Sequence, residues 1–171
     1  MFEAIMTSNK LNIILFSLTL LSSPLWALST DKEQPLEVEA DNFHLDEAKQ
    51  TTIYSGNVII TQGTMELLAD KVTMYSLEGK TEKMIAIGKI VKFKQQPDGD
   101  QGIIHGEAKR FEYLVNKDVL VLTNKATLLQ DGNTFASDRI VYDSKRSIVK
   151  AGDQKTGAKR VKIILQPAKS P

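Results

Sequence analysis

The stretch 51–75, TTIYSGNVIITQGTMELLADKVTMY, constrains the fold most, because apolar and polar residues alternate along it. Val72 and Met74 lie between polar neighbours, which places apolar groups on one face of an extended strand. Two turn signals, Gly56-Asn57 and Gln62-Gly63, divide the stretch. The sequence therefore predicts three short strands that form a sheet with one apolar face.

The same unit returns further along the chain at a constant offset. Ala40, Phe43, Gln62, Asp70 and Val72 map in this way onto Ala108, Phe111, Gln130, Asp138 and Ile140. Because the apolar positions stay in phase, we interpret the chain as one strand-and-turn module that is used repeatedly.

The remaining sequence continues this pattern. After Ala27, no segment of about ten or more residues has a 3.6-residue apolar period, and turn residues recur about every 8 to 12 positions. This spacing predicts an all-β fold, of the sandwich, roll or solenoid type.

Composition excludes several classes of protein. The 171 residues contain no cysteine, which rules out disulfides and thiolate metal sites. With 22 basic and 21 acidic residues the net charge is +1, and no basic tract indicates nucleic-acid binding.

No catalytic constellation is present in the sequence. The two histidines, His44 and His105, both sit within strand alternation, and no nucleophile elbow, phosphate loop, dinucleotide fingerprint or zinc spacing occurs. The residues alone therefore offer no candidate for a catalytic, cofactor or metal site.

The N-terminus has the features of a secretory signal. Lys10 precedes an apolar run over 11–21, and Ala27 ends a segment suited to cleavage. An uncleaved anchor is the alternative, although the run is shorter than the roughly 20 residues of a spanning helix. We expect a signal peptide over 1–27, a flexible lead-in over 28–35, one domain over 36–166 and a short tail over 167–171.

Three segments carry a resemblance to a known family. They are QPLEVEAD (34–41), GNVIITQGT (56–64) and ADKV (69–72), of which the second is the most specific. Further matches follow at 88–93, 117–123 and 157–161, so the likeness spans nearly all of the mature chain. The sequence resembles the OstA-like family of lipopolysaccharide-transport proteins.

This resemblance implies a fold and a function that composition alone does not. The fold would be a β-jellyroll of about sixteen antiparallel strands, open at its ends, with a continuous apolar groove inside. The function would be to hold the acyl chains of lipid A, the lipid anchor of lipopolysaccharide, in the periplasm. The resemblance also implies head-to-tail stacking into a bridge between an LptC-like inner-membrane protein and an LptD-like outer-membrane protein. Energy would come from an ATPase elsewhere, so this chain would be no enzyme and would have no cofactor.

Strand alternation selects candidates for the groove lining. They are Leu36, Val38, Phe43, Phe93, Phe111, Tyr113 and Val115. The resemblance implies that four of these positions match family positions that face the lipid: Leu36, Val38, Phe93 and Val115. The alternative interpretation is that these side chains are ordinary core residues.

The two ends of the domain carry opposite charges. Glu37, Glu39 and Asp41 lie in the first predicted strand, and Lys159, Arg160 and Lys162 lie in the last. Open edges of opposite charge suit a head-to-tail contact, although each charge could equally protect a solvated edge from unwanted pairing.

Two other functions stay open at this point. One is a membrane-anchored, LptC-like partner with the same fold, which would retain the N-terminal segment. The other is an envelope scaffold or glycan-binding β-domain. The second would use exposed aromatic platforms, yet the only tryptophan, Trp26, lies in the predicted signal.

Overall fold

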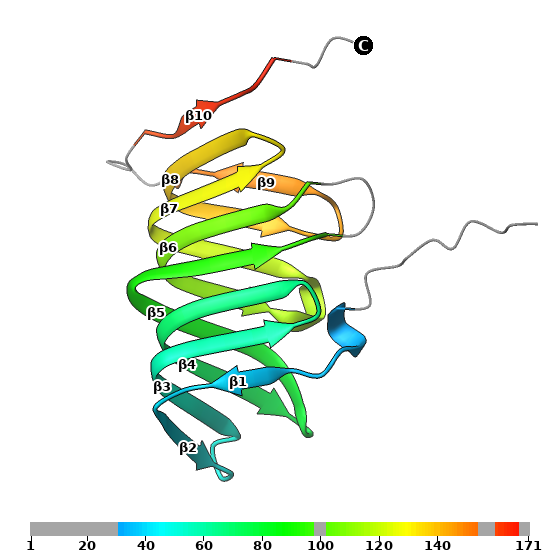
Figure 1. The fold of residues 1–171 in the computed structure, drawn as a ribbon, viewed down its shortest axis with the longest axis vertical. Coiled ribbons are helices and arrows are strands. Elements are labelled where there is room, and N and C mark those ends of the chain that lie inside the picture. Colours follow the sequence, from blue (N-terminus) through cyan, green and yellow to red (C-terminus); the bar gives the residue numbers. More distant parts are fainter. Residues whose placement is uncertain (1–30, 98–101, 154–159, 168–171) are drawn as a thin grey trace, which may run out of the picture.

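The computed structural model describes residues 31–97, 102–153 and 160–167. Within these ranges the chain forms ten antiparallel strands and two short 3-10 helices, η1 and η2 (Figure 1). The elements are, in chain order, η1 (Asp31–Glu33), β1 (Glu37–Glu39), β2 (Asn42–Asp46), β3 (Thr51–Gln62), β4 (Met65–Leu77), β5 (Lys80–Gln95), β6 (Ile104–Leu114), η2 (Val115–Lys117), β7 (Val119–Gln130), β8 (Asn133–Asp143), β9 (Ile148–Ala151) and β10 (Lys162–Ile164). The predicted signal peptide 1–27 and most of the predicted tail lie outside the described residues. The predicted all-β fold is confirmed.

The six long strands, β3 to β8, are each interrupted near their middle. The pairing register shifts between Ser55 and Val58 of β3 and at the matching places of the strands that follow it. A bulge of this kind bends a strand, so each long strand contributes one half to each of two facing layers. The bends lie in neighbouring strands and form one continuous spine.

Each layer ends in short strands of its own. We call them the β1 layer, which runs from β1 through the long strands to β10, and the β2 layer, which runs from β2 to β9. Within the described residues each layer thus holds eight strand segments, and the ten strands give the sixteen segments expected for the fold. The segments stack along the long axis of the molecule (Figure 1).

The sequence interpretation was wrong about Gly56-Asn57, which lies inside β3 and does not separate two strands. Gly56 has φ +81° and Asn57 has φ +47°, so both residues adopt the left-handed conformation of a bulge. The side chain of Asn57 donates from Nδ2 to Asp41 Oδ2 at 2.9 Å. The dipeptide therefore turns β3 from one layer into the other.

The predicted repeat is visible in the element bounds. β7 and the start of β8 follow β3 and the start of β4 at the same constant offset. Asp70 of β4 lies at the spine, where its Oδ2 accepts a hydrogen bond from the backbone N–H of Lys89 at 2.9 Å. This contact gives Asp70 a structural role at the spine.

The core lies between the two layers. Its largest fully buried side chains include Phe111, Ile60, Leu128 and Tyr142, which come from both layers. Phe93 in the β1 layer and Phe111 in the β2 layer meet across the core, with ring centroids 6.2 Å apart. The interior is apolar along the whole stack.

Candidate functional site

An apolar cavity lies between the layers near the middle of the stack. It is narrow, with a volume of about 10 Å³, which is the room that a single water molecule needs. We call it the inner cavity; its lining comes from Met65, Leu67, Met84, Ala86, Phe93, Phe111, Tyr113 and Leu120. Every lining side chain is apolar or aromatic, and the two methionines can adapt to irregular shapes. Such a lining suits hydrocarbon rather than a polar ligand. Because the cavity is narrow, a hydrocarbon chain would enter it only if the two facing layers moved apart.

A second cavity lies beside it at the edge opposite the spine, where the strand tips of both layers come together. This mouth cavity has a volume of about 80 Å³. Its lining comes from Asp31, Lys32, Leu36, Gln62, Met65, Thr81, Met84, Gln95, Tyr113 and Val115. Met65, Met84 and Tyr113 line both cavities, so the mouth cavity adjoins the inner one. An amphipathic ligand would have its apolar part inside and its polar part at the mouth.

The structure brings only some of the predicted groove residues together. Phe93, Phe111 and Tyr113 line the inner cavity, while Leu36 and Val115 line the mouth cavity together with Tyr113. Val115 is not in a strand as predicted, because β6 ends at Leu114 and Val115 begins η2.

The other two predicted groove residues lie at the end of the stack. Val38 of β1 pairs with the fully buried Ile60 and packs against the core. Phe43 of β2 lies against the ring of Tyr54, with ring centroids 5.5 Å apart, but is 62% exposed, because no further strand of the described residues covers it. Both side chains extend the apolar interior to this open end.

The opposite end of the stack is open in the same way. Val149 of β9 pairs with buried Tyr142, and Ile163 of β10 pairs with Phe135, so both face the interior. Ile163 is 52% exposed. The apolar interior therefore reaches both ends of the molecule, and each end leaves strand edges without a partner among the described residues.

Some of the charged residues that were predicted for these edges lie on the edge strands. Glu37 and Glu39 are exposed on β1 and Lys162 is exposed on β10. Asp41 lies beyond β1 and contacts Asn57 at the spine. Arg160 is exposed just before β10, and Lys159 is outside the described residues.

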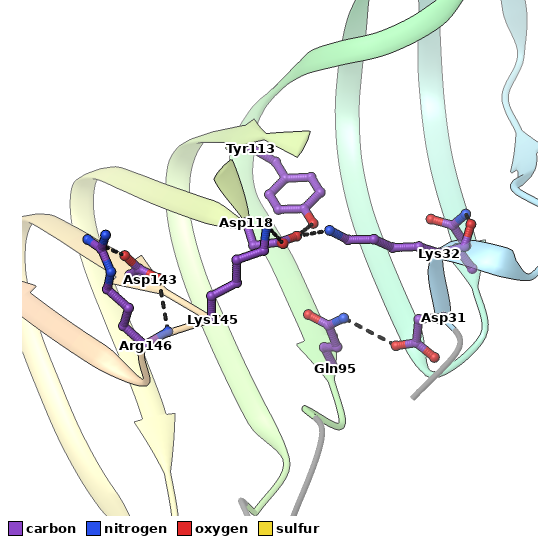
Figure 2. Close-up of polar contacts among 9 residues, drawn as sticks. Asp31, Lys32, Gln95, Tyr113, Asp118, Asp143, Lys145 and Arg146 are labelled. Atoms are coloured by element: carbon purple, nitrogen blue, oxygen red, sulfur yellow. Dashed lines mark hydrogen bonds and ion pairs between the residues drawn. The ribbon is translucent and has the colours of Figure 1, made fainter. Parts of the chain in front are cut away.

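A charged cluster at the mouth was not predicted from the sequence (Figure 2). Asp118, whose side chain is 9% exposed, forms ion pairs with Lys32 and, at 3.1 Å, with Lys145. Tyr113 donates its hydroxyl to Asp118 Oδ1 at 2.9 Å. Burial raises the pKa of Tyr113, and the negative charge of Asp118 adds to this, so the phenol stays protonated.

The pKa of Asp118 itself reflects opposing effects. Burial acts to raise it, but hydrogen bonds from Lys32, Lys145 and Tyr113 lower it below the ordinary value of an aspartate. Asp118 is thus charged near neutral pH and can hold both lysines. No local signal in the sequence marks these residues, because Lys32, Tyr113 and Lys145 reach Asp118 from three different segments.

The described residues contain no group of three or more His, Cys, Asp or Glu side chains that could hold a metal ion. Nor do they include a helix with the length and hydropathy needed to cross a membrane. The chemistry available at the site is apolar burial with a charged rim.

Comparison with known proteins decides the family. The sequence profile described as "LptA/(LptD N-terminal domain) LPS transport protein" matches residues 37–148. The chain belongs to this LPS transport family. The predicted resemblance is therefore confirmed, and the match covers nearly all the strands described above.

Members of the LPS transport family resemble the chain over nearly its whole length. The lipopolysaccharide export system protein LptH of Pseudomonas aeruginosa is 35% identical over 165 residues, covering 91% of this chain and 94% of that protein. LptA of Escherichia coli (strain K12) is 35% identical over 162 residues, covering 93% and 86%. LptA of Haemophilus influenzae is 34% identical over 166 residues, covering 95% and 94%.

A solved structure from the same family agrees with the fold. The crystal structure of LptH from Pseudomonas aeruginosa superposes with a TM-score of 0.72 at 34% identity, covering 80% of this chain and 99% of that one. That protein is described as the LptA-homologous periplasmic component of a conserved lipopolysaccharide transport device.

Proposed function

We propose that this chain is a periplasmic carrier that shields the acyl chains of lipopolysaccharide on their way from the inner to the outer membrane. The observation that carries this proposal is an apolar interior that reaches both open ends of the stack. Burial is worth about 0.8 kcal/mol per methylene, so a chain of a dozen carbons costs roughly 10 kcal/mol to leave in water. The carrier binds and releases lipid and catalyses no reaction.

The arrangement of strands also supports head-to-tail stacking. Neighbouring segments are antiparallel throughout, and each layer has an even number of segments among the described residues. In two copies related by translation, β10 of one copy would therefore run antiparallel to β1 of the next, and β9 to β2. Both layers would continue across the junction by strand addition.

A stack of this kind would join the two interiors. Phe43 and Val38 at one end would meet Ile163 and Val149 at the other, which removes apolar side chains from water. The same edges would pair the chain with an LptC-like protein at the inner membrane and an LptD-like protein at the outer membrane. No cofactor is needed, because a trough for hydrocarbon requires only apolar surface.

Binding of the lipid is tested with purified residues 28–171. Fluorescent lipopolysaccharide is mixed with the protein below its aggregation concentration, and the mixture is separated by gel filtration. We expect the label to co-elute with the protein, and unlabelled lipopolysaccharide to displace it. Elution of the label only as free aggregates would contradict the carrier function.

Stacking is tested by charge reversal at the open edges. Glu39→Lys or Lys162→Glu alone should weaken self-association, measured by sedimentation, while the double variant restores it, since exposed ion pairs contribute about 0.2 to 1 kcal/mol each. Glu66→Lys is the matched control, because Glu66 is also exposed but lies on β4, which has a neighbouring strand on each side. Equal behaviour of all four variants, or self-association that is insensitive to salt, would refute the electrostatic contribution.

A further inference from the structure

The segment 31–35, which we call the N-terminal strap, lies along the mouth and is held firmly by the β1 layer. Asp31, only 7% exposed, accepts hydrogen bonds from Thr64 N and Thr64 Oγ1, both at 2.7 Å, and from Gln95 Nε2 at 3.2 Å. Gln62 Nε2 donates to the backbone carbonyl of Gln34 at 3.0 Å. All of these donors lie at strand tips of the β1 layer.

The strap contacts the β2 layer in a different way. Lys32 extends across the mouth and forms an ion pair with Asp118, which lies in the turn between β6 and β7 (Figure 2). The side chain of Lys32 is 54% exposed, whereas that of Asp118 is 9% exposed. An ion pair with one half-exposed partner is weak, so this attachment breaks more easily than the buried Asp31 anchor.

The position of the strap matters because of what lies beneath it. Asp31 and Lys32 line the mouth cavity, and the residues shared with the inner cavity, Met65, Met84 and Tyr113, form its floor. Asp31 also sits directly on the backbone of Gly63, where an added Cβ would come within 2.9 Å of the Asp31 Cα. A hydrocarbon chain that reaches the inner cavity from the side has to pass the strap.

We propose that the strap is a gate for lateral uptake of acyl chains, with Asp31 as its fixed end and the Lys32–Asp118 ion pair as its latch. This inference rests on the proposed carrier function. Breaking the latch frees the strap from the β2 layer, so the two layers can separate at the mouth while Asp31 keeps the strap attached. The gate controls the rates at which an acyl chain enters and leaves, and it does not change the equilibrium constant for binding.

The experiment compares two lysines that contact the same carboxylate. Lys32 crosses the mouth, whereas Lys145 reaches Asp118 from the turn between β8 and β9, within the β2 layer. Binding of a fluorescent 12-carbon fatty acid to residues 28–171 is followed by stopped-flow mixing. We expect Lys32→Gln to raise both the association and the dissociation rate about two- to fivefold, as loss of a partly exposed ion pair implies, with an unchanged equilibrium constant. Lys145→Gln should leave both rates as in the wild type.

A second measurement tests the fixed end. In Lys32→Gln, hydrogen exchange at the Thr64 amide should stay as slow as in the wild type, because that amide still donates to Asp31. Equal rates in Lys32→Gln and the wild type, or equal acceleration in both variants, would overturn the gate while leaving the carrier function intact. If the wild type bound neither fatty acid nor lipopolysaccharide, the carrier function would fail, and the gate with it.

Discussion

Replacing Phe111 with alanine distinguishes a simple core residue from one that also lines a ligand site. Phe111 is 1% exposed, contacts the ring of Phe93 and borders the inner cavity. Truncation of a buried phenylalanine costs about 3 to 5 kcal/mol. Because one side of this ring already faces the cavity, fewer contacts are lost, and we expect about 3 kcal/mol. A domain with about 5 to 15 kcal/mol of stability remains folded after that loss.

An acyl chain in the inner cavity would fill the space that the ring leaves. A ligand at about 100 times its dissociation constant stabilises a protein by about 2.7 kcal/mol. We expect Phe111→Ala to bind dodecanoate about tenfold more tightly than the wild type. At equal ligand concentration, dodecanoate should therefore stabilise the variant by about 1.4 kcal/mol more than it stabilises the wild type. Urea unfolding followed by circular dichroism, with and without dodecanoate, measures both quantities.

The control for this experiment is Ile140→Ala. Ile140 is 0% exposed but does not line the inner cavity, so its truncation should cost about 2 to 5 kcal/mol without any additional gain from the ligand. A loss below about 1 kcal/mol in Phe111→Ala, or equal gains from dodecanoate in both variants, would refute the reasoning.

Two further predictions concern the latch and the spine. Burial acts to raise the pKa of Asp118, but hydrogen bonds from lysines such as Lys32 lower it below the ordinary aspartate value. The charged Asp118 therefore stabilises the folded state fully above the pKa of an unfolded aspartate, about 3.9. This stabilisation is lost as the pH falls through the lower pKa that Asp118 has in the folded protein. The difference in unfolding free energy between wild type and Asp118→Asn should therefore shrink from pH 5 to about pH 2; a constant difference would be inconsistent with this. Gly79→Ala at φ +75° should cost about 1 kcal/mol, whereas Gly56→Ala at φ +81° should cost about 2 to 4 kcal/mol, since only there would the Cβ approach Asp41 Oδ2 to 2.3 Å. Equal losses in urea unfolding would show that the contact with Asp41 is unimportant.

Local sequence patterns predicted the strands and their inward faces well. Val72 and Met74, whose alternation indicated an apolar face, are buried in β4, and the repeat along the sequence matches the bounds of β3 and β7. The alternation of apolar and polar residues indicates directly which face of a strand is buried, because successive side chains point to opposite faces. The jellyroll itself came from the family resemblance and not from alternation.

Features that depend on contacts between distant segments could not be predicted. Gly56-Asn57 has the composition of a hairpin turn, and only the pairing of β3 with β4 on both sides of it shows that the strand continues through a bulge. Asp31 and Lys32 fall in a polar stretch expected to be a flexible lead-in, yet they lie in η1 and contact both layers. The partners of these two residues become apparent only once the two layers face each other.

The most direct test of the carrier function places a photo-crosslinking amino acid at Phe93 in residues 28–171 and adds purified lipopolysaccharide. Phe93 is 9% exposed and lines the inner cavity, while Lys94, the next residue on β5, is exposed on the outside and serves as control. The proposed function predicts a lipopolysaccharide adduct at Phe93 and none at Lys94. Equal adducts at both positions, or none at either, would contradict an interior lipid site.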